Sequence, residues 1–439
     1  MNEPTKNDIE LVMNGLKNFY GNMLAKGIFD IIYFKNYMEK IFLQAGYREN
    51  CPLGGGNILI IHDGGAGDFV TETATIREIR RLYPKAHITL VVFAAAYQLA
   101  ETCPYVDELI SNSRSFQWLD IPASYRWNMD FARQLLERRF DICFTLTCWA
   151  ETALLAYMSG TKIQIASVID CPKDKSVNGE QKRFFQNFAT DIAPTENCKH
   201  IVDMYLSSID NLLKMPVADR SLELWTTPAD NRIAKNFIGD AGTKNLFAVA
   251  FGGSALTKHY PPEKYAQVLQ MIVAEEADAK FILLGAGQND VISAETVKQF
   301  FPKFYAEHII DLTNKLNYRQ SAAILRCCKM YIGNDTGMMH VAEAMKLPCL
   351  VQFSFPADLP TDSHDAPRRL YPYNVPTVVI LPAHALPECA ADKSYNSQGC
   401  KVSDKPHCIA TIEPETIFKG YKILQDRIIR GLTAPFYLY

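Results

Sequence analysis

The stretch "YIGNDTGMMH", residues 331–340, places two small polar residues, a glycine and a histidine between an apolar run and a helical pattern. It passes from a short apolar run through "GND" into the helical pattern "HVAEAMKLP", which predicts a strand, a tight turn and a helix. Asp335 or Thr336 can accept hydrogen bonds from the free N–H groups of the first helical turn. Capping alone requires neither Gly337 nor His340. The turn is therefore also a candidate anion site, at which the helix N-terminus binds a group such as a phosphate.

Short apolar runs alternate with helical patterns along most of the chain. "NILIIHD", "HITLVVF" and "FDICFTL" are such runs in the first half, and "LFAVAFGG", "KFILLGAG" and "PCLVQFS" in the second. This alternation predicts βαβ units and parallel sheets. The segment "TTPADN", residues 226–231, is a candidate linker between the halves. We therefore expect an α/β protein of two Rossmann-like, doubly wound domains, with ligands bound in a cleft beyond the carboxyl ends of the strands.

A helical prefix precedes the first strand. In residues 8–45, apolar residues recur at helical spacing. We expect a helical extension over residues 1–50 that packs as a helical pair on the main body. The alternative is an aromatic-rich surface that contacts a membrane or a second subunit of a homo-oligomer.

Composition excludes several classes of protein. The chain has 439 residues, of which 48% are hydrophobic and 21% charged, as in ordinary soluble globular proteins. A net charge of -3 gives no reason to expect a nucleic-acid partner. The sequence has no secretory signal pattern and no apolar run that could span a bilayer. The 12 cysteines are scattered, which favours a reducing cytoplasm over a disulfide framework.

The first strand-to-helix turn carries the candidate catalytic residue. In "IIHDGGAGDFV", the glycines permit close approach of the backbone, and Asp68 follows at the start of the helix. The order Gly-Gly-Ala-Gly-Asp lacks the dinucleotide fingerprint GxGxxG. Asp68 either caps the helix or serves as a carboxylate that takes a proton from a hydroxyl group.

Two further glycine-rich turns lie in the second half. "FGGSALTKHYPPEKY" offers the hydroxyl of Ser254 and the ammonium of Lys258, which could neutralise a diphosphate. It is not a Walker A motif, because the order GK[ST] is missing. "LLGAGQND" offers Asn289 and Asp290 as candidate ribose partners. Because these turns end strands of one sheet, we expect a nucleotide-linked donor in the second domain and an acceptor at the first.

At these residues the chain resembles the ADP-heptose-using heptosyltransferases of glycosyltransferase family 9, which have the GT-B fold. The similarity covers about residues 56–420. It includes "NILIIHDGGAGDFVTETATIREIRRLYPKAHITLVV", "GSALTKHYPPEKYAQV" and "GNDTGMMH", which fits the family motif Gly-x-Asp-Thr/Ser-Gly-x-x-His. The domains implied are an acceptor domain over residues 51–225, a nucleotide-sugar domain over 226–414, and a C-terminal helix and tail, 415–439, that cross back to the first domain.

The resemblance also assigns the site. It implies that Asp68 is the general base of an inverting transfer that requires no cofactor or metal, with ADP-heptose as the donor. Ser254 and Lys258 would touch the phosphates, and His340 would support the site. The residues that would line the diphosphate are Asp335, Thr336, Gly337 and Met338.

The acceptor is less well defined by the resemblance. Two departures lie on the acceptor side: the family often has a basic residue where His62 stands, and "TLT" near residue 146 replaces its usual Asp-Leu-Gln. We expect a saccharide acceptor of the cell envelope, of lipopolysaccharide type, and an enzyme in the cytoplasm or at the inner face of the cytoplasmic membrane. A protein acceptor on the bacterial surface and a non-catalytic nucleotide-sugar binder are the alternatives.

A cysteine-containing segment near the C-terminus is a candidate metal site. Cys389, Cys400 and Cys408 have His384 and His407 nearby, and three thiolates with one imidazole could hold structural zinc or iron. The spacing lacks a CxxC, so a segment without metal is the alternative.

Overall fold

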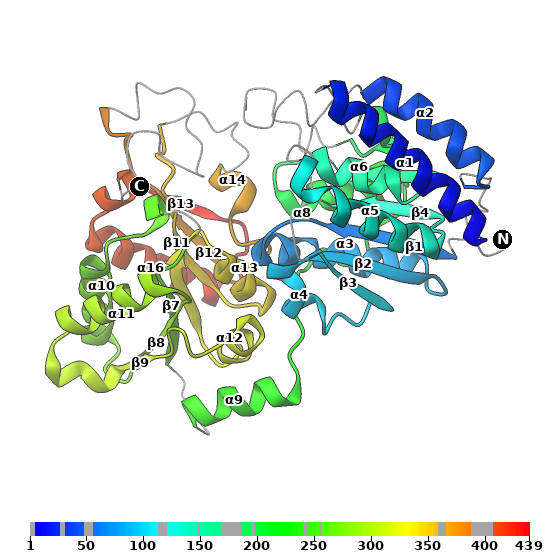
Figure 1. Cartoon of the computed structure of the whole chain (residues 1–439). Helices are drawn as coiled ribbons and strands as arrows, with labels where there is room; N and C mark the ends of the chain where they lie inside the picture. The colour runs from blue at the N-terminus through cyan, green and yellow to red at the C-terminus, as the bar shows by residue number, and fades with distance from the viewer. Residues whose placement is uncertain are drawn as a thin grey trace.

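Two parallel sheets, each flanked by helices, form the body of the protein (Figure 1). This arrangement confirms the predicted α/β class. The computed structural model describes residues 5–26, 31–47, 56–112, 121–146, 150–167, 186–194, 198–239, 245–253, 256–358, 366–387 and 407–439. Of the helices in these ranges, none is long and apolar enough to cross a membrane.

The sheet of the first half has the strand order β3-β2-β1-β4-β5-β6, and every pair is parallel. Its central strand β1 is buried along almost its whole length, which explains its nearly continuous apolar sequence. The strands are β1 (Asn57–His62), β2 (His87–Phe93), β3 (Glu108–Asn112), β4 (Ile142–Thr145), β5 (Ile163–Ala166) and β6 (Asp191–Ile192). The helical segments are α3 (Ala66–Leu82), α4 (Ala94–Ala100), α5 (Ile121–Arg138), α6 (Ala150–Met158), α8 (Ile201–Ser207) and η1 (Ser208–Leu212).

The sheet of the second half has the order β13-β12-β11-β10-β7-β8-β9 and is also parallel throughout. The strands are β7 (Leu246–Ala250), β8 (Lys280–Leu284), β9 (Ile309–Asp311), β10 (Met330–Asn334), β11 (Cys349–Gln352), β12 (Thr377–Ile380) and β13 (Phe436–Leu438). The helical segments are η2 (Leu256–Lys258), α10 (Pro262–Glu275), α11 (Gln288–Phe300), η3 (Lys303–His308), α12 (Tyr318–Leu325), α13 (Gly337–Ala344), α14 (Pro367–Leu370), η4 (Cys408–Thr411) and α16 (Pro414–Ile429). The strand that ends at the quoted turn, β10, is buried at every position.

The segment predicted as a linker begins a helix, α9 (Pro228–Ile238). Thr227 is the N-cap, Pro228 occupies the first turn, and the Asp230 carboxylate accepts a hydrogen bond from the backbone N–H of Thr227 at 2.8 Å. This reciprocal capping box stabilises the helix start. The connection between the two halves therefore contains ordered helix, as Figure 1 shows at its lower edge.

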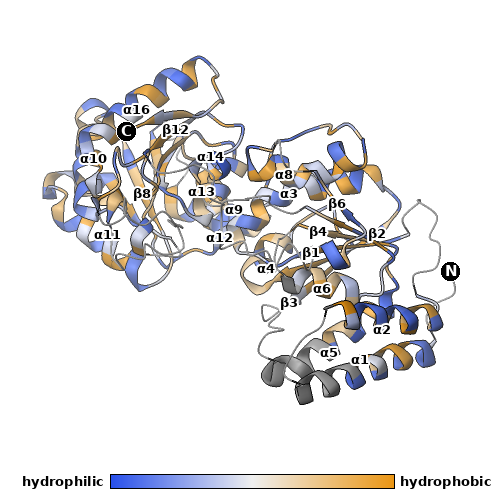
Figure 2. Cartoon of the chain, turned by 90° about the horizontal axis from the view of Figure 1, so that it is seen from above, coloured by the Kyte–Doolittle hydropathy of each residue, from blue (hydrophilic) through white to orange (hydrophobic). Residues whose placement is uncertain are grey.

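The prefix forms two helices, α1 (Lys6–Lys26) and α2 (Ile31–Gln44), that pack on the first half. Phe34 and Phe42 of α2 are fully buried, and both rings contact Tyr157 of α6. The Tyr157 hydroxyl donates a hydrogen bond toward the Glu39 carboxylate at 3.1 Å. In Figure 2 both helices show alternating polar and apolar residues, as expected for helices with one buried face.

The C-terminal segment lies on the second half. The buried residues of α16, such as Ile417, Tyr421 and Leu424, belong to the apolar cluster of that half, and β13 pairs with β12. The family resemblance implies that residues 415–439 lie on the first domain, and the structure corrects this expectation. The physical reason is that "FYL" adds an edge strand to the second sheet, which holds the preceding helix beside it.

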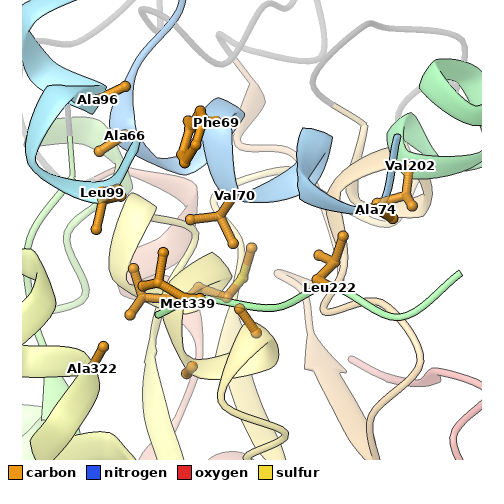
Figure 3. Close-up of a cluster of buried hydrophobic side chains, with 14 of the residues drawn as sticks. Ala66, Phe69, Val70, Ala74, Ala96, Leu99, Val202, Leu222, Ala322 and Met339 are labelled. Atoms are coloured by element: carbon orange, nitrogen blue, oxygen red, sulfur yellow. The ribbon is translucent and has the colours of Figure 1, made fainter. Parts of the chain in front are cut away.

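One apolar cluster crosses the boundary between the halves. It contains Val70 of α3 and Leu99 of α4 from the first half, with Ala322 of α12 and Met339 of α13 from the second (Figure 3). Arg319 at the start of α12 adds a polar contact, because it donates to the Glu101 carboxylate at 2.5 Å. These contacts fix the two halves against each other at the end of the sheets where the strand-to-helix turns lie.

Two neighbouring residues of α2 test how the prefix is held. Phe42→Ala should destabilise the protein by ~3–5 kcal/mol, because it removes a fully buried ring and leaves a cavity. Leu43→Ala, at a position 58% exposed, should change the free energy of unfolding by less than about 0.5 kcal/mol. Denaturant unfolding of both variants measures the difference. Equal stability of the two variants would show that α2 does not pack on the first half.

Candidate active site

Two helix N-termini, one from each half, meet where the two halves touch. A Cβ atom added to Gly67, in the first turn of α3, would lie 2.9 Å from the Cα of Gly337, the first residue of α13. A Cβ added to Gly337 would lie 3.4 Å from the Gly67 nitrogen and 3.3 Å from the Tyr318 hydroxyl. No larger residue fits at Gly67 without moving the backbone. This contact brings the turns at residues 62–68 and 333–340 together, as the sequence analysis expects.

Asp68 stands beside this contact and is exposed. The N-cap of α3 is Gly65, and Asp68 is the third helical residue. Its Oδ2 accepts a hydrogen bond from the Gly65 backbone N–H at 2.8 Å. The capping role proposed for Asp68 is therefore performed from inside the first turn. An exposed carboxylate at a helix N-terminus can accept a proton from a hydroxyl group that approaches it.

Thr336 caps the helix that follows the quoted stretch. Its hydroxyl accepts a hydrogen bond from the Met338 backbone N–H at 3.1 Å. Of the two caps that the sequence offers, Thr336 is the one used. Asp335 is buried instead, with 7% of its surface exposed.

Asp335 forms an ion pair with Lys258. Lys258 Nζ lies 2.8 Å from Asp335 Oδ2, and both side chains are about nine-tenths buried. Two of the three turns that the sequence analysis assigns to the donor are therefore joined by a charge pair. The ammonium of a lysine carries three hydrogens, so Lys258 can bridge Asp335 and a second anion.

A buried polar network that the sequence analysis misses supports the same turn. Asn334 donates a hydrogen bond from Nδ2 to the Phe251 carbonyl at 2.5 Å, which ties the end of β10 to the end of β7. The Tyr265 hydroxyl lies 2.7 Å from Asn334 Oδ1 and 2.9 Å from Gln352 Oε1. The signal in the sequence is a polar residue at the end of each of two apolar strands, Asn334 in β10 and Gln352 in β11.

The two candidate ribose partners have different environments. Asn289 is exposed in the first turn of α11, where a ligand can reach it. Asp290 is buried, and its carboxylate accepts a hydrogen bond from the Ala286 backbone N–H at 2.8 Å. A Cβ at Gly252 or Gly285 would lie 2.7 or 2.5 Å from Asp290 Oδ2. Asp290 therefore packs against two glycine turns and holds them in place.

His340 is buried and paired with a carboxylate. Its Nδ1 lies 2.6 Å from Glu343 Oε1, and the other Glu343 oxygen accepts a hydrogen bond from the backbone N–H of Tyr373. Burial opposes a charge on the ring, but the Glu343 carboxylate outweighs burial and raises the pKa of His340. The ring also touches the first half, because its Cδ2 lies 3.1 Å from where a Gly67 Cβ would be. The position is that of a residue that supports the turn from behind.

A second buried pair lies on the other side of Asp68. His62 ends β1, and its Nδ1 lies 2.9 Å from Glu72 Oε1 of α3, with both residues fully buried. From the sequence, His62 is only a departure from the basic residue that is usual in the family on the acceptor side, and Glu72 is not identified. Its signal is the spacing: Glu72 lies one helical turn beyond Asp68, on the same side of α3.

Several predicted residues lie outside the described ranges. Ser254, Cys389 and Cys400 are among them. Cys408 is buried, with its sulfur 3.5 Å from His407 Nδ1, and His384 is exposed 3.3 Å from Asp358. Within the described part of the chain, no group of three metal-binding side chains comes together.

Known proteins resemble this chain in sequence and in fold. The family described as glycosyltransferase family 9 (heptosyltransferase) matches residues 128–357. Lipopolysaccharide heptosyltransferase 2 of Escherichia coli is 21% identical over 323 residues, which cover 70% of this chain and 86% of the relative. A family 9 glycosyltransferase structure from Veillonella parvula superposes with a TM-score of 0.62 and 20% identity, over 84% of this chain and 97% of that one.

The fold of this chain is also that of Escherichia coli ADP-heptose lipopolysaccharide heptosyltransferase II. The TM-score is 0.60 at 16% identity, over 85% of this chain and 99% of that one. The two parallel sheets with their facing turns are thus the GT-B fold, as predicted. Because the family match spans more than half of the 439 residues, the chain belongs to glycosyltransferase family 9 and is a glycosyltransferase.

Proposed function

We propose that the protein transfers heptose from ADP-heptose, with inversion, to a hydroxyl group of a lipopolysaccharide-type saccharide. Membership of family 9 supports the transfer of a sugar. The names of the relatives, lipopolysaccharide heptosyltransferase 2 and ADP-heptose lipopolysaccharide heptosyltransferase II, support the donor and the acceptor class. The observation that carries the proposal is the meeting of α3 and α13, with Asp68 exposed beside it.

Asp68 is the proposed general base. An acceptor hydroxyl bound at the N-terminus of α3 would lose its proton to the Asp68 carboxylate as its oxygen attacks the anomeric carbon. The bond between that carbon and the diphosphate oxygen then breaks, and the electron pair leaves with ADP. Because attack and departure are in line, the anomeric configuration inverts.

The departing diphosphate is the proposed ligand of the turn at residues 335–340. The N-terminus of α13 presents backbone N–H groups and the positive end of the helix dipole, which favour an anion. Lys258 cancels the charge of Asp335 beside this turn, so the carboxylate does not repel the phosphates. Groups that are fixed before the reaction and stabilise the leaving charge lower the barrier without reorganisation.

Product analysis tests the reaction as a whole. The protein should release ADP from ADP-heptose only in the presence of heptose-deficient lipopolysaccharide core, and mass spectrometry should show the core heavier by one heptose. A heptosylated protein in a cell extract, with unmodified core, would move the acceptor to the protein class. Binding of ADP-heptose without transfer to either would make the chain a non-catalytic binder.

Asp68→Asn tests the base. The amide oxygen can still accept the hydrogen bond from Gly65, so α3 should remain capped. Single-turnover transfer should fall by ~10²–10⁴-fold, the usual contribution of general-base catalysis. Melting temperature and ADP affinity should stay at wild-type values.

Asp63→Asn is the matched control. Asp63 is the neighbouring carboxylate, and its burial raises its pKa. Its replacement should leave single-turnover transfer within a few-fold of wild type. Loss of transfer in Asp63→Asn together with normal transfer in Asp68→Asn would assign the base to Asp63 instead.

Lys258→Ala tests the donor site. It should weaken ADP binding by ~1–3 kcal/mol, the scale of a lost hydrogen bond to a charged group. Part of this loss should come from Asp335, which the variant leaves buried without Lys258, next to the phosphates. The double variant Lys258→Ala/Asp335→Asn should therefore bind ADP more tightly than Lys258→Ala alone. Calorimetric titration with ADP measures all three proteins, and unchanged affinity in Lys258→Ala would remove Lys258 from the site.

A further inference from the structure

The buried pair of His62 and Glu72 lies directly beneath the turn that carries Asp68. His62 is the last residue of β1, and Glu72 lies in the second turn of α3, so the pair joins the strand to the helix across residues 63–67. Their closest atoms, His62 Nδ1 and Glu72 Oε1, are 2.9 Å apart. The Phe69 ring packs edge-on against His62 at 5.6 Å between ring centroids. Water is excluded from both side chains.

The exposed carboxylate and the buried ring share one neighbour, Gly64. A Cβ atom on Gly64 would lie 3.0 Å from His62 Cε1 and 3.1 Å from Asp68 Oδ2. His62 Cε1 and Asp68 Oδ2 therefore both approach the space that a side chain at Gly64 would fill. The other ring nitrogen, His62 Nε2, is buried with no hydrogen-bond partner within the described residues.

The charges around the ring favour its protonated form. Burial opposes a charge on His62, but the carboxylate of Glu72, helped by Asp68 and Asp63, outweighs burial and raises the pKa of His62. Burial raises the pKa of Glu72 as well, against the opposite effect of His62. The charged groups that act on the pair thus come from the end of β1, from the turn and from α3, and all of them except His62 are acidic.

We propose that His62, held by Glu72, is a positioning residue for Asp68: it places a positive charge beneath the turn that holds the Asp68 carboxylate in its orientation. This inference rests on the proposed function, because it gives Asp68 the role of the base. Glu72 fixes the ring through Nδ1, and Cε1 lies toward Gly64. Asp68 then carries two constraints, the Gly65 N–H at 2.8 Å and the field of the imidazolium.

If His62 and Glu72 served only to fill the core, a buried ion pair would stabilise the fold poorly compared with apolar residues. Two buried charges lose their hydration, and their mutual attraction often fails to repay the loss, so that apolar residues of similar size are as stable or more stable. His62 Nε2, which has no hydrogen-bond partner among the described residues, adds a further cost. A functional role for the positive charge of His62 accounts for a buried ion pair beneath the first strand-to-helix turn of the first half.

Glu72→Gln tests the role with little change in shape. The amide oxygen can still accept a hydrogen bond from His62 Nδ1, but the negative charge that supports the imidazolium is gone. We expect kcat for transfer from ADP-heptose to heptose-deficient core to fall roughly tenfold, a part of the ~10²–10⁴-fold that a general base contributes. KM for ADP-heptose should stay unchanged. If Glu72→Gln fails to fold, His62→Gln removes the positive charge of the imidazolium itself.

A double-mutant cycle with Asp68→Asn separates positioning from general stability. If the pair acts through Asp68, Glu72→Gln should have no further effect on kcat in the Asp68→Asn background. Multiplicative losses in the double variant would overturn the inference, as would wild-type kcat in Glu72→Gln while Asp68→Asn is impaired. Normal transfer by Asp68→Asn itself would instead overturn the proposed base.

His308→Gln is the matched control for burying a histidine. His308 is also buried and bonded through Nδ1, but its partner is the Ala279 carbonyl at 2.6 Å in the second half. This variant should lower the melting temperature and leave kcat unchanged. A tenfold loss of kcat in His308→Gln would show that kcat reports stability and would overturn the reading of the Glu72→Gln result.

Discussion

The backbone contact between Gly67 and Gly337 is the constraint on which the rest of the site depends. It brings the N-termini of two helices, α3 and α13, into contact, and each carries roughly half a positive charge from its aligned peptide dipoles. Such ends repel unless negative groups lie between or beside them. Asp68 in the first turn of α3 supplies this charge, whereas the charge of Asp335 is balanced by Lys258. The junction is thus a place where anions are favoured, and the protein's own carboxylates are arranged around it.

The halves are held in this arrangement by contacts of two kinds. The apolar cluster that includes Val70 and Met339 supplies the larger, non-directional part. Polar contacts fix the register: Arg319 joins α12 to Glu101 and lies 3.3 Å from Asp230 of α9, and the buried ring of His200 donates to the Tyr371 carbonyl at 2.8 Å. Burial lowers the pKa of His200 to about 3, so this ring remains a neutral donor over the whole range of physiological pH.

Sequence patterns predict the alternation of strands and helices well because buried parallel strands require continuous apolar runs. The glycine-rich turns at residues 64–67 and 333–337 are predictable for a different reason: only glycine permits the close backbone approach seen there. The ion pair of Lys258 with Asp335 and the pair of His62 with Glu72 are not predictable, because each depends on which side chains a turn brings within 3 Å. The place of the C-terminal strand is missed as well: a three-residue run such as "FYL" carries no pattern that selects one sheet edge over another.

The position of the prefix has a consequence for synthesis of the chain. Helix α2 leaves the ribosome well before its partners, because the Phe34 ring packs against Tyr157 and Phe188, which come more than 100 residues later. At ordinary translation rates of ~5–20 residues per second, the interval is on the order of ten seconds. During that time Phe34, Met38 and Phe42 have no partner surface in the first half. The nascent chain thus exposes an aromatic surface that a chaperone can bind, and α2 reaches its final place only after residues that are made much later.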